Sequence, residues 1–252
     1  MMLPIIDDLG ILPPIGAWAE LALVPEWPEL GPREVHVWAV IGTDSPDAAR
    51  RHRQLLSEEE LARAQRFIQP SHGIRFTRSH AALRLVLSRY TAQAPEALVF
   101  DKRAGGKPVL VEHPAIEFNL AHSEEATVVA VTRAGDIGVD VEALRPMDDA
   151  DGLVERFFSA YEFEAYMALP PALREAAFFT AWTRKEAYVK ALGEGLATPL
   201  DSFSVNTDVP ARLLEPVEPP WTFRHLDLSS GYVGALASPV AGLALRGGRI
   251  EL

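Results

Sequence analysis

Apolar and polar residues alternate strictly over residues 137–142, where the chain reads Ile-Gly-Val-Asp-Val-Glu. A period of two is typical of a half-buried β-strand, so the isoleucine and both valines are expected to face a core. Asp140 and Glu142 would then lie on the opposite face, with α-carbons about 6.5 to 7 Å apart. Neighbouring carboxylates repel each other unless a cation lies between them, and Mg²⁺ takes such oxygen ligands. The pattern therefore indicates either a cation site or an ordinary solvated strand face.

Other stretches show the same alternation or the spacing of an amphipathic helix. Ser57 with Glu60, and Ser159 with Glu162, have the spacing of a capping box, which marks the start of a helix. Gly193 is expected to end a long helix. The predicted helices span about 57–67, 72–90, 159–170 and 172–192, and the predicted strands span 35–41, 116–120, 127–132, 203–205, 221–226 and 232–237.

The tight turn at residues 134–136 is the expected boundary between two halves, 35–135 and 136–252. Each half reads as a strand, then helices, then further strands, which indicates a duplicated architecture without a detectable sequence repeat. Residues 1–34 form a Pro-rich N-terminal extension, whose tryptophans are expected to pack on the body of the protein.

The last long helix carries the sequence Trp-Thr-Arg-Lys-Glu-Ala-Tyr-Val-Lys. At helical spacing Trp182, Glu186 and Lys190 lie on one stripe, with Lys185 beside it. Taken singly, the tryptophan is a core residue and the glutamate and lysine are a surface pair. If this helix packs on the sheet, however, the stripe can meet the two strand carboxylates. Three carboxylates would then hold Mg²⁺, while the two lysines face bound phosphates.

Three further features have both a structural and a functional interpretation. The basic glycine loop at 101–108 lacks the P-loop signature, and a plain turn is the alternative to a phosphate contact. His122 lies at a predicted strand end, where a hydrogen-bonded structural role is the alternative to catalysis. Arg75 shares a helix face with Arg78, whereas Arg84 points away. The chain has no GxSxG, HExxH or GxGxxG motif, so triad hydrolases, zincins and Rossmann enzymes have no support.

Composition narrows the class of protein. The chain has 252 residues and a formal net charge of −11, which disfavours a broad surface for nucleic acid or for an anionic membrane. It has no cysteine, and therefore neither disulfides nor thiolate metal ligands. The N-terminus lacks a basic secretory signal, and no apolar run reaches the roughly 18 residues of a membrane span. We expect a soluble, cytoplasmic protein.

Taken in order, the motifs resemble those of 4′-phosphopantetheinyl transferases of the Sfp type. The resemblance spans about residues 35–237. It rests on Gly-Lys-Pro at 106–108, Phe-Asn-Leu-Ala-His-Ser at 118–123, Ile-Gly-Val-Asp-Val-Glu at 137–142, Arg-Phe-Phe-Ser at 156–159, the lysine-rich helix at 182–195 and Pro-Leu-Asp-Ser-Phe at 199–203. Each motif is weak alone, but their order and spacing together are specific.

The resemblance implies an α/β (α+β) fold, in which a pseudo-twofold pair of similar subdomains each packs a small, mainly antiparallel sheet with helices. The active site would lie at their junction. Such enzymes use coenzyme A and Mg²⁺ to transfer phosphopantetheine to a serine of an acyl or peptidyl carrier protein, releasing 3′,5′-ADP. We expect a monomer with no nucleic-acid or membrane partner, serving polyketide, nonribosomal peptide or related biosynthesis.

The resemblance also implies roles for individual residues. Asp140, Glu142 and Glu186 match the metal-binding carboxylates, and Glu186 also matches the base that activates the carrier serine. Lys185 and Lys190 match basic residues near the pyrophosphate. Further contacts to the phosphates of coenzyme A would come from Arg75, Lys107 and His122, with Lys102 as an additional candidate.

Two departures from the family pattern affect phosphate recognition. Ala121 stands where many relatives have serine, so one phosphate hydrogen bond would be missing. Near the 3′-phosphate the chain offers Arg63 and Arg66 in place of the lysines of some relatives. Two other functions stay open at this point. One is a non-catalytic binding module for coenzyme A or a carrier protein, and the other is a different Mg²⁺-dependent phosphoryl-transfer enzyme, which would be expected to carry a P-loop or a kinase-type loop.

Overall fold

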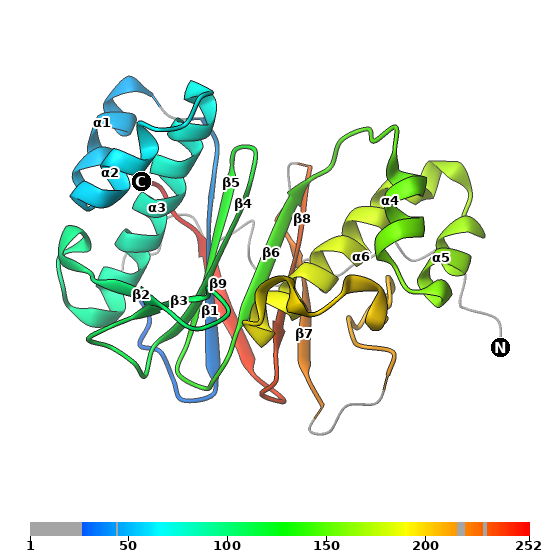
Figure 1. Cartoon of the computed structure of the whole chain (residues 1–252). Coiled ribbons are helices and arrows are strands. Elements are labelled where there is room, and N and C mark those ends of the chain that lie inside the picture. Colours follow the sequence, from blue (N-terminus) through cyan, green and yellow to red (C-terminus); the bar gives the residue numbers. More distant parts are fainter. Residues whose placement is uncertain (1–26, 44, 216–219, 229–230) are drawn as a thin grey trace.

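A computed structural model describes residues 27–43, 45–215, 220–228 and 231–252. Two sheets pack face to face, and each carries a long helix on its outer side (Figure 1). The first sheet contains, in spatial order, β4 (Glu117–Ser123), β5 (Ala126–Thr132), β1 (Glu34–Ile41) and β9 (Ala244–Arg249). The second contains β6 (Gly138–Ala143), β8 (Tyr232–Ser238) and β7 (Thr222–Asp227). The structure is therefore α+β, as the sequence predicts.

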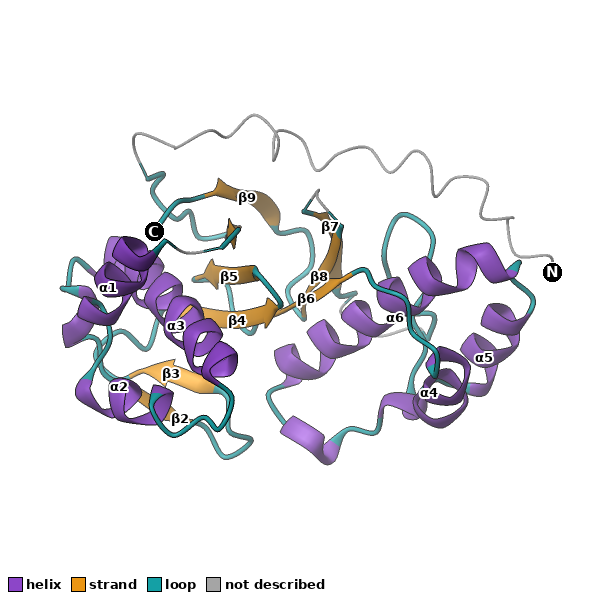
Figure 2. Cartoon of the chain, turned by 90° about the horizontal axis from the view of Figure 1, so that it is seen from above, coloured by secondary structure: helices purple, strands orange, loops and turns teal. Residues whose placement is uncertain are grey.

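The helices form two groups, one beside each sheet (Figure 2). The group beside the first sheet consists of α1 (Pro46–Gln54), α2 (Glu58–Ala64) and α3 (Pro70–Thr91), with the short segment η1 (Pro95–Ala97) and the hairpin of β2 (Phe100–Lys102) and β3 (Pro108–Leu110). The group beside the second consists of α4 (Ala150–Phe157), α5 (Ala160–Met167) and α6 (Pro171–Leu192), followed by η2 (Gly195–Ala197) and η3 (Leu200–Ser202).

Strand direction within the first sheet is mixed. β1 pairs antiparallel with β5 and parallel with β9. Because β9 comes from the end of the chain, the first sheet takes strands from both sides of the expected boundary near residue 135. The division into two halves therefore has one exception, the last strand.

The core between the sheets is built from small and branched apolar side chains. Val35 and Val37 of the first sheet meet Val139 and Val141 of β6, and all four are at most 1% exposed. The alternation at 137–142 thus buries its apolar face between the sheets, as the sequence predicts. The other face of the strand, with Asp140 and Glu142, is left toward α6.

Local signals in the sequence predict the helix ends well. Both capping boxes are present, at the starts of α2 and α5. Gly193 follows α6 in the left-handed conformation with φ of 71°, which glycine adopts without steric cost. The strand predicted at 203–205 is wrong, because that segment contributes only an isolated bridge between Val205 and Leu213.

Trp27 is the described residue of the N-terminal extension that tests its expected packing. Its ring lies 4.2 Å from that of Trp38 and 6.1 Å from that of Tyr90. The extension therefore contacts the body at this point, while residues 1–26, including Trp18, lie outside the described residues. Over the ranges that are described, no helix is long and apolar enough to cross a membrane.

The contact between β6 and α6 is unusually close. A Cβ atom added at Gly138 would lie 2.0 Å from the main-chain oxygen of Ala187 and 2.4 Å from the main-chain nitrogen of Ala191. Small residues on both elements let the strand backbone approach the helix backbone. This contact fixes which residues of α6 lie above the carboxylate face of β6.

We predict that Gly138→Ala lowers the free energy of unfolding by about 2–3 kcal/mol, because the added methyl group must push α6 away from the strand. The matched control is Gly152→Ala on α4, where an added Cβ meets nothing within 4 Å. The control should leave stability unchanged or raise it by up to about 1 kcal/mol, since alanine is the better helix former. Urea denaturation of both variants measures the difference. Equal stability for the two would contradict the close approach.

Candidate active site

Lys190 of α6 contacts Asp140 of β6, two residues along the strand from the close approach at Gly138. Its Nζ is 2.6 Å from Oδ1 of the aspartate. The Asp140 side chain is 8% exposed, and no described residue bonds to its buried Oδ2. The structure thus brings Asp140 and Lys190 into direct contact, and leaves the second oxygen of the aspartate without a partner in the described part of the chain.

The electrostatics of the three carboxylates are coupled. Burial raises the pKa of Asp140 to about 6, although Lys190 acts in the opposite direction, and Glu142 and Glu186 raise it further. Burial also raises the pKa of Glu186, with Lys190 opposing and Glu142 adding to the rise. A raised pKa means that the charged form is destabilised, so a cation at this place would be bound favourably.

Glu142 is held by residues outside α6. Its Oε2 accepts a hydrogen bond of 2.7 Å from the hydroxyl of Ser123 and lies 3.5 Å from Arg145. Within the described part of the chain, no three His, Cys, Asp or Glu side chains are gathered closely enough to hold a metal as they stand. Asp140 instead forms an ion pair with Lys190, and Glu142 accepts a hydrogen bond from Ser123.

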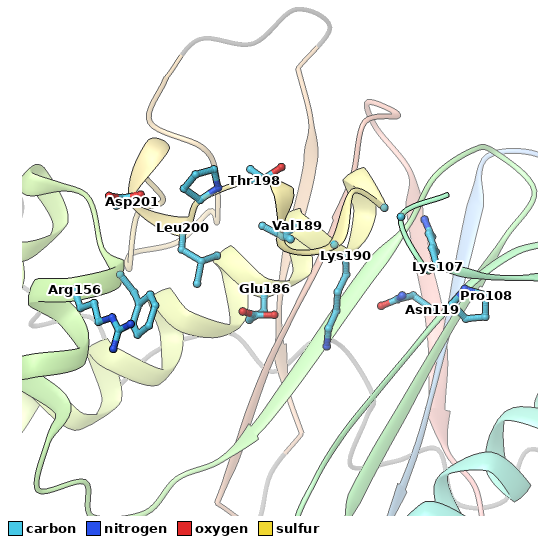
Figure 3. Close-up of a pocket in the computed structure, with 16 residues that line it drawn as sticks. Lys107, Pro108, Asn119, Arg156, Glu186, Val189, Lys190, Thr198, Leu200 and Asp201 are labelled. Atoms are coloured by element: carbon cyan, nitrogen blue, oxygen red, sulfur yellow. The ribbon is translucent and has the colours of Figure 1, made fainter. Parts of the chain in front are cut away.

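A pocket of about 580 Å³ opens beside Glu186 and Lys190. Figure 3 shows these two side chains next to each other on α6, with Arg156 and Leu200 on one side and Asn119 on the other. The lining residues are Gly105–Pro108, Asn119, Arg156, Phe157, Glu186, Val189, Lys190, Gly193, Gly195 and Thr198–Asp201. The pocket therefore joins the glycine loop of the first half to α6 and the segment after it.

The glycine loop is fixed against the end of α6. A Cβ atom at Gly105 would lie 1.7 Å from the main-chain oxygen of Gly193, so only glycine allows this contact. Lys107 places its Nζ 3.0 Å from Asp136 and 3.4 Å from the carbonyl oxygen of Ala191. Its side chain is 3% exposed. Lys107 lines the pocket, but its ammonium group contacts the end of α6 and Asp136.

Among the described residues that line the pocket, neither Arg75 nor His122 is present. Arg75, on α3, pairs with Glu124 at the β4–β5 turn and lies 3.7 Å from Glu125. His122 is at the end of β4, where partial desolvation, Lys190 and Arg75 lower its pKa. Arg78 lowers the pKa of His122 further, whereas Glu142 acts in the opposite direction.

Lys102 and the two arginines near the expected 3′-phosphate position are less closely tied to this cluster. Lys102 is exposed on β2. Arg63 lies on α2, with its guanidinium 5.0 Å from the ring of Phe76, and Arg66 is exposed after that helix. Their expected contacts with coenzyme A stay predictions.

Lys185 does not lie where the sequence analysis expects it. Its side chain is fully buried, and Nζ is 2.6 Å from Glu162 and 2.6 Å from the carbonyl oxygen of Phe203. Glu162 in turn caps α5 and accepts a bond of 2.7 Å from the main-chain nitrogen of Val205. Adjacent positions on a helix are about 100° apart, so the residue before Glu186 points into the second half. We therefore leave Lys185 out of the proposed phosphate site.

Sequence reasoning missed the contributions of Asn119 and Ser123, which it used only as parts of a motif. Asn119 lines the pocket and accepts a hydrogen bond of 2.9 Å from the main-chain nitrogen of Val139. Both residues lie on β4 and bond to β6. Their signal was two polar residues four positions apart on one face of a strand, with Ala121 between them.

Comparison with known proteins identifies the family. A family model described as the 4′-phosphopantetheinyl transferase superfamily matches residues 136–237. The chain is similar to the 4′-phosphopantetheinyl transferase HetI of a Nostoc species, at 38% identity over 209 residues that cover 81% of this chain and 87% of the relative. The chain belongs to this superfamily. Other similar transferases are psf-1 of Bacillus pumilus, at 35% identity over 64% of this chain and 69% of the relative, and Sfp of Bacillus subtilis, at 29% identity over 64% and 70%.

The family predicted from the sequence motifs is therefore confirmed, and the protein is a transferase of the phosphopantetheinyl class. The matched range 136–237 contains all three carboxylates and Lys190. It does not contain the glycine loop, Arg75 or His122, which belong to the first half.

The buried ion pair of Lys185 with Glu162 should stabilise this phosphopantetheinyl transferase. Lys185→Ala leaves Glu162 buried without its cation, which should cost about 3–5 kcal/mol of unfolding free energy. The control Lys102→Ala removes an exposed lysine and should change stability by less than about 0.5 kcal/mol. Denaturant titration measures both. A Lys185→Ala variant with unchanged stability and weakened coenzyme A binding would restore the phosphate role.

Proposed function

We propose that the protein transfers 4′-phosphopantetheine from coenzyme A to a serine of an acyl or peptidyl carrier protein. The observation that supports this most strongly is the meeting of β6 and α6, where Asp140 and Glu142 lie close to Glu186 and Lys190 beside a pocket. In a member of this superfamily, that arrangement suits phosphoryl transfer, because a cation held by the carboxylates and the ammonium group of Lys190 would balance the negative charge of the phosphates.

The three carboxylates have the donor chemistry for a magnesium ion, although among the described residues they are not gathered around one point. Its ligands would be oxygens of Asp140, Glu142 and Glu186, the hard donors that Mg²⁺ prefers. The buried Oδ2 of Asp140, without a partner among the described residues, is an acceptor of this kind. A bound Mg²⁺ would stabilise negative charge on the phosphate oxygens during transfer. It would compete with Lys190 for Asp140, and Lys190 would be freed to contact a phosphate.

Basic side chains around the carboxylates provide the remaining charge for coenzyme A. Lys190 is 30% exposed, and its charge and that of Arg75 lower the pKa of His122. We assign these three groups to the pyrophosphate and adjoining phosphate oxygens. Lys107 would support the loop rather than bind a phosphate directly, because its ammonium already contacts Asp136 and the end of α6.

The pocket beside Glu186 suits the pantetheine arm. Phe157, Val189 and Leu200 contribute apolar side chains, while Asn119 and Arg156 contribute polar ones. The arm alternates methylene groups with amides, so a wall of mixed character can bind it. The arm would then enter the pocket while the pyrophosphate stays at Lys190.

In the proposed reaction, the hydroxyl of the carrier serine attacks the β-phosphate of coenzyme A. A new oxygen–phosphorus bond forms to the serine, and the bond from phosphorus to the oxygen bridging the two phosphates breaks, which releases 3′,5′-ADP. Glu186 accepts the serine proton. Lys190 stabilises the charge on the leaving phosphate.

We also propose the finer expectations for the architecture. Each sheet carries a helix of 22 residues on its outer face, α3 in one case and α6 in the other, which supports a pseudo-twofold pair of subdomains. The junction between the two halves is internal to one chain, which supports a monomer. Cytoplasmic location remains the expectation for an enzyme that uses coenzyme A.

The direct test is the intact mass of an apo acyl carrier protein after incubation with the protein, coenzyme A and Mg²⁺. We predict a gain of one phosphopantetheine that is lost when EDTA is added. Glu186→Gln removes the base and one carboxylate, and should slow transfer at least about 100-fold.

The control for this variant is Glu175→Gln, which changes an exposed glutamate on the same helix and should leave transfer unchanged. Full activity of Glu186→Gln would contradict the assigned role. Tight coenzyme A binding without transfer to several different carriers would favour the non-catalytic binding module.

A further inference from the structure

β4 and β6 belong to different sheets, yet polar side chains of β4 bond to the backbone of β6. The main-chain nitrogen of Val139 donates to Asn119 Oδ1 at 2.9 Å, and that of Ala143 donates to Ser123 Oγ at 3.1 Å. The two donors are four residues apart, as are the two acceptors. The strands therefore run in a fixed parallel register that is set by side chains rather than by a main-chain ladder.

The residue between the two acceptors explains how the strands come this close. Ala121 lies midway between Asn119 and Ser123 on the same strand face, and it is 3% exposed within the core between the sheets. A small apolar side chain at this position fills the gap between two hydrogen bonds.

Ser123 makes a second bond that Asn119 does not. Its hydroxyl donates to Glu142 Oε2 at 2.7 Å while its oxygen accepts from Ala143. The single hydroxyl proton therefore has a defined direction, because the accepting side is fixed by the backbone of β6. The other partner of Glu142 is Arg145, which is 48% exposed and 3.5 Å away, so water screens it more strongly.

We propose that Ser123 is a positioning residue that orients Glu142 for the divalent cation, and that the first half of the chain thereby completes the cation site of the second. The inference rests on the proposed function. Both contacts of Glu142 fall on Oε2, which leaves Oε1 without a partner among the described residues. A serine that fixes one carboxylate oxygen leaves the other to bind the cation, as outer hydrogen bonds do around metal ligands.

The test is binding of Mn²⁺, followed by water-proton relaxation, to the full-length protein with coenzyme A present and carrier protein absent. Ser123→Ala should weaken Mn²⁺ binding about tenfold or more. Ser123→Thr keeps the hydroxyl and should bind Mn²⁺ within about threefold of the parent protein, since a strand position accepts a β-branched residue. In the transfer assay, Ser123→Ala should raise the half-saturating Mg²⁺ concentration and leave the KM for coenzyme A nearly unchanged.

The matched control is Ser238→Ala. Like Ser123, Ser238 donates one hydrogen bond and accepts another from a main-chain nitrogen, that of Val240, but its acceptor is the main-chain oxygen of Asp136, and no described carboxylate bonds to its hydroxyl. It should lower the melting temperature about as much as Ser123→Ala and leave the Mn²⁺ affinity unchanged. The same loss of Mn²⁺ affinity in both variants, or in neither, would overturn the role of Ser123. A parent protein that transfers phosphopantetheine but binds no Mn²⁺ would overturn the carboxylate site as well, whereas loss of transfer in the parent would reject the proposed function itself.

Discussion

The close contact of β6 with α6 at Gly138 is the constraint on which the arrangement of the site depends. Because the strand backbone approaches Ala187 and Ala191 without an intervening side chain, the next outward-facing residue of the strand lies beneath Lys190. One residue of slip would turn Asp140 and Glu142 into the core between the sheets, where a carboxylate is strongly disfavoured. The same small residues that allow tight packing therefore also determine which polar groups meet.

The chain is acidic, yet the proposed site needs positive charge. The formal net charge is −11, so the proposed function requires a few basic residues, brought together locally, to bind the phosphate groups. Two of the expected lysines have other roles, Lys107 at the end of α6 and Lys185 beside Glu162. Lys107 holds the glycine loop against the end of α6, and Lys185 joins α6 to α5 and to Phe203. Lys190 remains partly exposed beside the pocket.

The sequence was most informative where the signal is local. Alternation at 137–142, the capping boxes and the glycine after α6 all depend on neighbouring residues, and the structure has each of them. α1 and β9 were not predicted. α1 buries only His52 and thus lacks an apolar stripe, and β9 is recognisable as a strand only through its pairing with β1. The direction of Lys185 likewise depends on a partner 23 residues away, which helical spacing alone does not reveal.

We propose that the carboxylates of β6 and α6 hold the cation that acts on the phosphates of coenzyme A. The most direct measurement is anomalous diffraction from crystals of the protein grown with coenzyme A and Mn²⁺. We expect one strong manganese peak within bonding distance of oxygens of Asp140, Glu142 and Glu186 and of phosphate oxygens, with Lys190 moved from Asp140 toward the pyrophosphate. A manganese peak at another place, or bound coenzyme A with its phosphates away from Lys190, would contradict this proposal.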